Sequence, residues 1–234
     1  MLVRQLFDRD SSTYTYLVAD LFNGVAALID PVREQIERDL ELVDQLGIRL
    51  THVLETHVHA DHVTASGALR ERTGALTYAS AAGAPCVDVH LHHGEVIKLG
   101  NVPITAIATP GHTDDGFSYV IDGAVFTGDT LLVRGCGRAD FQNGDPGQLY
   151  DSITRRLFTL PDRTIVYPGH DYRGFTTTTI GEEKRWNPRL SGKTREEFIA
   201  VMNGLALPPP RKIEEAVPAN RACGRTDEPP HPRT

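Results

Sequence analysis

The stretch that decides the fold is Thr51-His52-Val53-Leu54-Glu55-Thr56-His57-Val58-His59-Ala60-Asp61-His62, an apolar run followed by closely spaced histidines and an aspartate. Val53 and Leu54 suit the interior of a strand. The polar residues at the end would each need a hydrogen bond or a cation if buried, because an unpaired buried polar group costs about 1–3 kcal/mol. The stretch therefore predicts a buried strand that delivers metal ligands into a loop.

Length and composition limit the class of protein. The chain has 234 residues, of which 40% are hydrophobic, and a net charge of −7. We expect one domain over residues 1–224 and a disordered, Pro-rich tail over residues 225–234. The acidic balance, with no basic run, argues against binding to nucleic acid or to an anionic membrane, since both rely on clustered Lys and Arg. A small soluble substrate is the expected partner.

The cysteines and the N-terminus bear on location. Cys86, Cys136 and Cys223 are widely separated and odd in number, which does not indicate a disulfide framework and fits a reducing compartment. No apolar run approaches the roughly 18–20 residues of a membrane span. The chain begins with strand-like sequence and without the regions of a signal peptide. We expect a cytoplasmic protein, with a presequence already removed as the alternative.

Strand-like runs and helical repeats alternate along the chain. Residues 2–7, 12–18 and 25–29 indicate antiparallel strands, and residues 32–46 indicate an amphipathic helix. A second helix over residues 63–72 would place the ligand loop between a strand end and a helix start. Repetition of this order predicts an α+β fold of two stacked sheets with helices outside. The later expected elements are strands at 75–78, 96–99, 102–108, 117–121, 124–126 and 164–167, and helices at 147–157 and 194–205.

Three further strand-like runs end in a possible ligand. They are Thr109-Pro110-Gly111-His112-Thr113, Phe126-Thr127-Gly128-Asp129-Thr130 and Tyr167-Pro168-Gly169-His170-Asp171. The glycine before each ligand permits a tight turn and a close backbone approach. The imidazoles and carboxylates suit Zn, Fe or Mn, so we predict a metal site. The candidate set is His57, His59, Asp61, His62, His112, Asp129 and His170, whereas His90, His92 and His93 lie in a polar loop and are expected to be solvated.

The order of these ligands resembles that of the metallo-β-lactamase superfamily. The similarity covers residues 2–171 and implies an αββα sandwich of two mixed β-sheets flanked by helices, with the metal at one edge of the sheets. The superfamily includes β-lactamases, thioester hydrolases, nucleases and oxygenases. The fold by itself therefore does not determine the reaction.

Narrower motifs resemble the persulfide dioxygenases, also called sulfur dioxygenases. The most specific is Leu131-Leu132-Val133-Arg134-Gly135-Cys136-Gly137-Arg138-Ala139-Asp140-Phe141-Gln142. The similarity extends over nearly the whole chain up to Gly224. Residues 11–17, 59–67, 166–172, 187–190 and 217–221 agree with it.

That family resemblance implies a cofactor and a reaction. One Fe(II) per chain would be held by the catalytic residues His57, His112 and Asp129. Two imidazoles and one carboxylate form the facial triad of non-haem iron oxygenases, which leaves coordination positions open for substrate and O2. The implied reaction is oxidation of glutathione persulfide by O2 and water to sulfite and glutathione. The oligomeric state, monomer or homodimer, is left open.

The resemblance also assigns residues that contact the substrate. Arg138 and Tyr172 match residues that contact glutathione, and a guanidinium can bind a carboxylate through two hydrogen bonds while a phenol donates one. The alternative for Arg138 is a surface salt bridge. Cys136 matches a cysteine close to the active site, with a small buried packing residue as the alternative.

The remaining ligand candidates leave a second function open. His59, Asp61, His62 and His170 would supply a second metal in thioester hydrolases of the glyoxalase II (hydroxyacylglutathione hydrolase) type. The resemblance to the dioxygenases implies instead that these four residues do not bind the iron, but orient its ligands or hold water by hydrogen bonding. The short C-terminal region disfavours the hydrolase. A non-catalytic metal- or thiol-binding module is the third reading.

Overall fold

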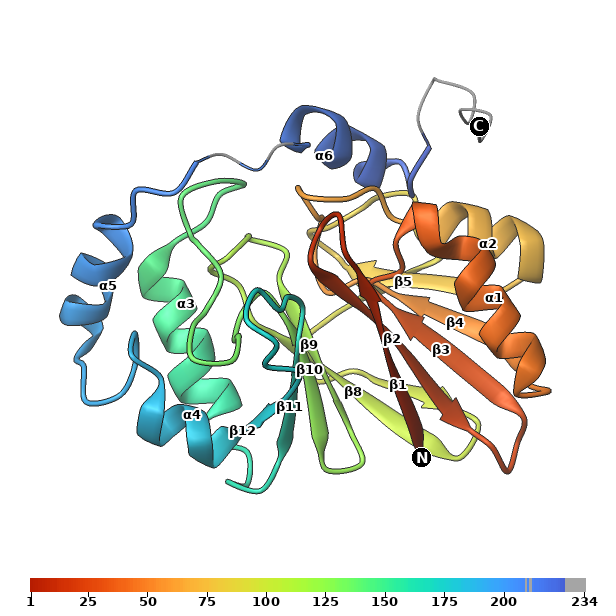
Figure 1. Ribbon diagram of the computed structural model, residues 1–234, viewed down its shortest axis with the longest axis horizontal. Helices are drawn as coiled ribbons and strands as arrows, with labels where there is room; N and C mark the ends of the chain where they lie inside the picture. The colour runs from red at the N-terminus through yellow and green to blue at the C-terminus, as the bar shows by residue number, and fades with distance from the viewer. Residues whose placement is uncertain (209, 211, 226–234) are drawn as a thin grey trace.

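The computed structural model describes residues 1–208, 210 and 212–225, so most of the expected tail, residues 225–234, lies outside the described residues. Two six-stranded sheets stack face to face, and helices cover their outer faces (Figure 1). This arrangement is the expected αββα sandwich. None of the described helices is long and apolar enough to cross a membrane.

The first sheet changes from antiparallel to parallel pairing after its third strand. Pairing is antiparallel from β1 to β3 and parallel from β3 to β6. Helices connect β3 to β4 and β4 to β5, as is usual for parallel crossovers. The first connection holds the 3-10 turn η1 (Arg33–Gln35) and α1 (Ile36–Gln45), and the second holds α2 (Ser66–Thr73). In order across the sheet, the strands are β1 (Leu2–Asp8), β2 (Thr13–Asp20), β3 (Val25–Ile29), β4 (Arg49–Leu54), β5 (Leu76–Ser80) and β6 (Val89–Leu91).

The second sheet brings three strand ends to one edge. Because β9 is antiparallel to both β8 and β10, and β10 is parallel to β11, the strands β8, β10 and β11 all end on the same side. In order across the sheet, the strands are β12 (Thr178–Thr179), β11 (Ile165–Pro168), β10 (Ala124–Gly128), β9 (Phe117–Ile121), β8 (Val102–Ala108) and β7 (Val96–Leu99). The helices are α3 (Pro146–Ser152), the π-helical turn η2 (Ile153–Leu157), α4 (Ile180–Trp186), α5 (Arg195–Asn203) and α6 (Ile213–Arg221).

Apolar residues fill three layers. Tyr16, Tyr119 and Phe126 pack between the two sheets. Val53 of β4 packs on the side of α1 and α2, and Val125 of β10 packs on the side of α3, α4 and α5. Successive residues of a strand point to opposite faces, so strands buried on both faces need the continuous apolar runs that the sequence shows.

Helix ends follow local sequence, with one exception. Gly47, one residue beyond the C-cap of α1, and Gly74, the C-cap of α2, adopt left-handed φ values of 64° and 74°, as expected of glycine at a helix end. The second helix was expected from residue 63 but begins at Ser66. The backbone of Val63 and Thr64 is bonded elsewhere: the carbonyl of Val63 accepts from the N–H of Arg33, and the N–H of Thr64 donates to a distant side chain.

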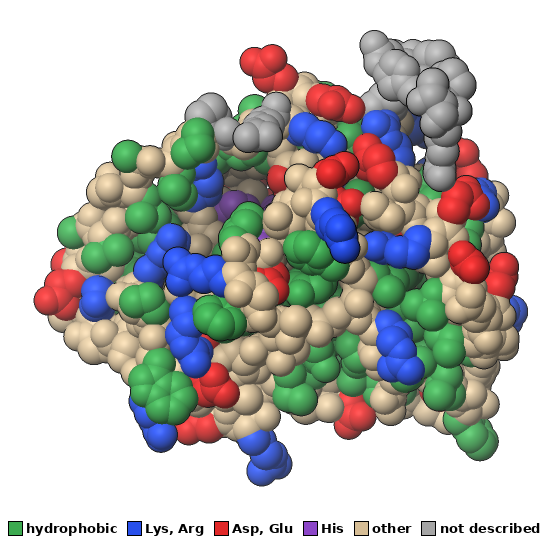
Figure 2. All heavy atoms as spheres, in the orientation of Figure 1, with side chains coloured by type: hydrophobic (Ala, Val, Ile, Leu, Met, Phe, Trp, Pro, Cys, Tyr) green, Lys and Arg blue, Asp and Glu red, His purple; other side chains and the backbone are tan. Residues whose placement is uncertain are grey.

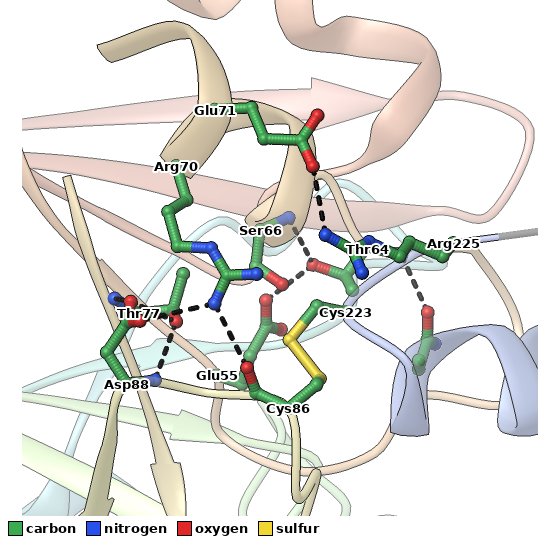
Figure 3. The surroundings of a disulfide bond; sticks show 11 residues. Glu55, Thr64, Ser66, Arg70, Glu71, Thr77, Cys86, Asp88, Cys223 and Arg225 are labelled. Carbon is green, nitrogen blue, oxygen red and sulfur yellow. Dashed lines mark hydrogen bonds and ion pairs between the residues drawn. A yellow bond between two sulfur atoms is a disulfide. The ribbon is translucent and has the colours of Figure 1, made fainter. Parts of the chain in front are cut away.

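The cysteine prediction was wrong. Cys86 and Cys223, 137 residues apart in sequence, form a disulfide bond with their Cα atoms 5.8 Å apart (Figure 3). An odd count and wide spacing carry no information on which cysteines the fold brings together. Only Cys136 is a free cysteine, and it is buried. The inference of a reducing compartment from the cysteines therefore fails, and the cytoplasmic location stays a prediction.

Candidate metal site

All the ligand-bearing segments meet at one edge of the sandwich. His57 lies in the loop after β4 of the first sheet, whereas His112 and Asp129 follow β8 and β10 of the second sheet. One ligand atom from each of these three residues lies within 4.8 Å of the others. His112 Nε2 is 3.5 Å from Asp129 Oδ2. Strand ends that are distant in sequence thus converge as expected, and the assignment of these residues as ligands remains a prediction.

Hydrogen bonds orient both imidazoles. His112 Nδ1 is 2.6 Å from the carbonyl oxygen of Arg138, so we assign its proton to Nδ1. His57 Nδ1 lies 3.0 Å from Thr56 Oγ1. That hydroxyl donates its own proton to Asp30 Oδ2 at 2.8 Å, so it accepts from the ring of His57. In both rings Nε2 keeps a lone pair for a metal, as expected of ligands held by a second set of hydrogen bonds.

The protonation state of His57 and the burial of Asp129 also fit a metal. Burial, followed by the nearby His59 and His112 rings, lowers the pKa of His57 well below its usual range, so the ring is neutral and able to coordinate. Asp129 Oδ1 is buried without a hydrogen-bond partner among the described residues. A separation of 3.5 Å between donor atoms suits a metal about 2.0–2.2 Å from each. The donor set therefore fits a divalent cation.

A second cluster lies next to the first. Ligand atoms of His59, Asp61 and His62 also lie within 4.8 Å of one another. His59 Nε2, however, faces two buried carboxylates, Asp30 Oδ1 at 3.1 Å and Glu55 Oε2 at 3.4 Å. Burial alone would lower the pKa of His59, but these carboxylates raise it well above its usual range. The two buried carboxylates beside its Nε2 favour an orienting role for His59, although the cluster geometry also accommodates a second ion.

Sequence reasoning missed Asp30 and Glu55. Asp30 was assigned only to a turn signal at the end of a strand, yet it is 1% exposed and accepts hydrogen bonds from both the N–H and the hydroxyl of Thr56. Its non-glycine φ of 51° turns the chain directly beside the ligand loop. The one available signal was its place at the end of β3, the strand that pairs with β4.

His170 lies between the two clusters. Its Nδ1 lies 3.0 Å from the carbonyl oxygen of Ser12, and its Nε2 is 3.5 Å from Asp129 Oδ2 and 3.6 Å from Asp61 Oδ2. Burial would raise the pKa of Asp61, but His62 and His170 hold it well below its usual range. Asp61 is therefore ionised and able to hold His170 in place.

A cavity of about 530 Å³ opens onto His57, His112 and Asp129, and histidine side chains are visible at the bottom of this hollow in Figure 2. The volume is within the usual range of about 300–1,000 Å³ for small-molecule sites. Cys136 also borders the cavity; burial raises the pKa of its thiol, and Sγ contacts Met202 Sδ at 3.7 Å. Four arginines are among the lining residues: Arg134, Arg138, Arg173 and Arg189.

The two expected substrate-contacting residues both border the cavity. Tyr172 is 70% exposed and stacks on the ring of His170 with centroids 5.3 Å apart. Arg138 pairs with Asp140 at 2.6 Å and also donates to the carbonyl oxygens of Leu207 and Pro208. The salt bridge considered for Arg138 is thus present, and a substrate carboxylate would compete with Asp140 for the guanidinium.

Comparisons with known proteins agree with the geometry. A family model described as the metallo-beta-lactamase superfamily matches residues 8–86 and 83–170. The chain is 45% identical over 227 residues to the mitochondrial persulfide dioxygenase ETHE1 of Bos taurus, covering 96% of this chain and 89% of that protein. The crystal structure of ETHE1 from Myxococcus xanthus is 61% identical, with a TM-score of 0.95, and covers 96% of this chain and 100% of that one. A hydroxyacylglutathione hydrolase of Rhizobium meliloti is 33% identical over 222 residues, covering 79% of this chain and 85% of that protein.

Proposed function

Because the chain belongs to the persulfide dioxygenase family of the metallo-β-lactamase superfamily, we propose that it oxidises glutathione persulfide with one Fe(II) per chain. In the balanced reaction, one persulfide, one O2 and one water give sulfite, glutathione and two protons. The observation that carries the proposal is the group His57, His112 and Asp129 at an open cavity. Three protein ligands leave coordination positions free, which a closed four-ligand site does not.

The chain's own groups prepare this site. Bound there, Fe(II) would supply open positions and the redox chemistry that lets O2 react with the persulfide sulfur. The carbonyl of Arg138 and the hydroxyl of Thr56 hold the two imidazoles in their coordinating tautomers. Arg138 thus serves the site twice, because its backbone orients His112 while its side chain borders the substrate cavity.

Arginines around the cavity support glutathione as the carrier of the persulfide. The chain is acidic overall, at −7, yet four arginines line this cavity. Glu182 and Glu183 neutralise Arg134. Arg138, which a substrate carboxylate would take from Asp140, and Arg173 are the guanidiniums that would bind the substrate's carboxylates. A guanidinium binds a carboxylate through two parallel hydrogen bonds. In this proposal the Tyr172 hydroxyl donates a further hydrogen bond to the tripeptide.

Metal analysis combined with an oxygen electrode tests the proposal. Protein purified without added metal should contain about one iron per chain and should consume O2 only when glutathione persulfide is added. Sulfite should appear in a one-to-one ratio with the O2 consumed. An iron-loaded protein that consumes no O2 with this substrate would refute the assignment.

A second candidate is a hydroxyacylglutathione hydrolase that uses two metals. The cluster of His59, Asp61 and His62 and the relative from Rhizobium meliloti favour it. It requires close to two metals per chain and release of glutathione from S-lactoylglutathione without O2. A non-catalytic binding module would retain metal and turn over neither substrate.

A further inference from the structure

The last described helix, α6, holds the metal-ligand loop through one side chain. Asn220 is 3% exposed, and its Nδ2 donates to the carbonyl oxygens of His59 at 2.9 Å and His62 at 2.8 Å. Its Oδ1 accepts from the N–H of Thr64 at 2.8 Å. One amide therefore satisfies three buried backbone groups of the loop, and without it each would be left unpaired at a cost.

A covalent bond fixes the end of the same segment. Cys223 is 2% exposed and is bonded to Cys86 in the connection between β5 and β6 (Figure 3). Its carbonyl oxygen also accepts from the N–H of Gly67 at 2.9 Å. A Cβ on Gly67 would lie 2.5 Å from that oxygen, so this approach requires glycine. The segment and the start of α2 are therefore in close backbone contact.

The N-terminal side of the metal-ligand loop is held by hydrogen bonds that do not depend on the disulfide. The N–H of Val58 donates to Asp115 Oδ2 at 2.8 Å, and its carbonyl accepts from Gln142 Nε2 at 2.7 Å. His57 precedes this fixed point, whereas Asn220 fixes the loop beyond it. Loss of the Asn220 contacts would free the loop on that side, where the ring of His59 lies against the ring of His57 with centroids 4.1 Å apart, so the change would reach the ligand through His59.

We propose that residues 213–224 act as a redox-sensitive clamp on the metal-ligand loop. Asn220 is its positioning residue, and the Cys86–Cys223 bond keeps the clamp closed, so the protein holds its metal more tightly with the disulfide formed than with it reduced. The proposal rests on the assignment of His57 as a metal ligand in the proposed function.

Opening the clamp requires a thiol reductant. A dithiol breaks the S–S bond, passes two electrons and two protons to the sulfurs of Cys86 and Cys223, and becomes a disulfide itself. Cys86 is half-buried and offers the more accessible sulfur. Reduction leaves the segment attached by hydrogen bonds and by the packing of Ala216 and Ala219 on Val63.

Co(II) binding tests the clamp without relying on turnover. The affinity for Co(II), its visible spectrum and its rate of loss to excess chelator are measured for the oxidised protein and for protein reduced with a dithiol that is then removed anaerobically. The same measurements are made on Asn220→Ala, Asn220→Asp and Cys86→Ser. Arg225→Ala is the matched control, because Arg225 belongs to the same C-terminal region and its side chain forms an exposed ion pair with Glu71.

We expect Asn220→Ala to weaken Co(II) binding about 10- to 100-fold, the usual effect of losing a group that orients ligands. Reduction and Cys86→Ser should each speed metal loss, by about 10-fold, the lower end of that range. Arg225→Ala should match the wild-type protein. If Asn220→Ala does not fold, Asn220→Asp keeps the side-chain size and an acceptor for Thr64 while removing the donors.

Thermal unfolding of the metal-free variants separates positioning from a purely structural role. The clamp is overturned if a variant is less stable but loses Co(II) at an unchanged rate. It is also overturned if the folded Asn220 variant and the reduced protein both bind metal as the wild-type protein does. Wild-type protein that binds no stoichiometric Co(II) overturns the ligand assignment and the clamp together.

Discussion

Opening the disulfide should cost much of the stability of the fold. The Cys86–Cys223 bond closes a loop of 137 residues. In the chain-entropy description, removing such a constraint from the unfolded chain lowers the free energy of unfolding by about 5 kcal/mol at 25 °C, an upper estimate. Whole domains are stable by only about 5–15 kcal/mol, so the reduced protein should lie close to its unfolding threshold.

Urea unfolding of oxidised and reduced protein measures this loss. With a slope of about 2–3 kcal/mol per molar urea, the midpoint should fall by roughly 2 M on reduction. Cys86→Ser should unfold near the reduced midpoint and show no further response to reductant. Thiol titration of the denatured, unreduced chain should find one thiol, that of Cys136, and three after reduction. Three thiols without reductant, or coincident unfolding curves, would refute the reasoning.

Further expected outcomes concern the metal, the substrate and pH. Asp129→Ala should abolish iron binding, whereas Arg138→Ala should retain iron and mainly raise the KM for glutathione persulfide; equal metal loss in both contradicts this division. Burial raises the pKa of Asp39 to about 6 from 3.8, so the folded state binds this proton more tightly and stability falls as pH rises from 3.8 through 6. Asp39→Asn should therefore gain stability at pH 8, by up to about 3 kcal/mol, and lose that pH dependence in urea titrations. Gly169→Ala places a Cβ 2.6 Å from Asp129 Oδ1 and should weaken Co(II) binding, whereas Gly204→Ala, whose nearest neighbour would be at 3.4 Å, serves as the tolerated control.

The sequence indicated the fold because its signals are local. Val53 and Leu54 lie in a strand buried on both faces, and Gly47 and Gly74 end helices by a conformation that glycine adopts easily. A strand end followed by glycine and a ligand also predicted where His112 would lie. Each of these signals depends only on residues a few positions apart.

What the sequence did not reveal depends on contacts between distant segments. Asp30 orients the ligand loop through Thr56, which follows the neighbouring strand β4, and Asn220 contacts Thr64, 156 residues earlier in the chain. Helix α6 also contains Pro218, which weakened its helical signal. The disulfide likewise depends on a contact between distant segments, since only the folded chain brings its two sulfurs together.

The position of the metal site at the seam between the sheets has a consequence for protein abundance. His57 is supplied by the first sheet, and His112 and Asp129 by the second, so a bound ion would add a link between two halves that otherwise meet through apolar packing and hydrogen bonds. An ion that binds only the folded chain adds about 2.7 kcal/mol of stability at a free concentration of 100 times its Kd. The lifetime of the protein in a cell should then follow the supply of metal, because chains starved of it unfold more often and are degraded sooner.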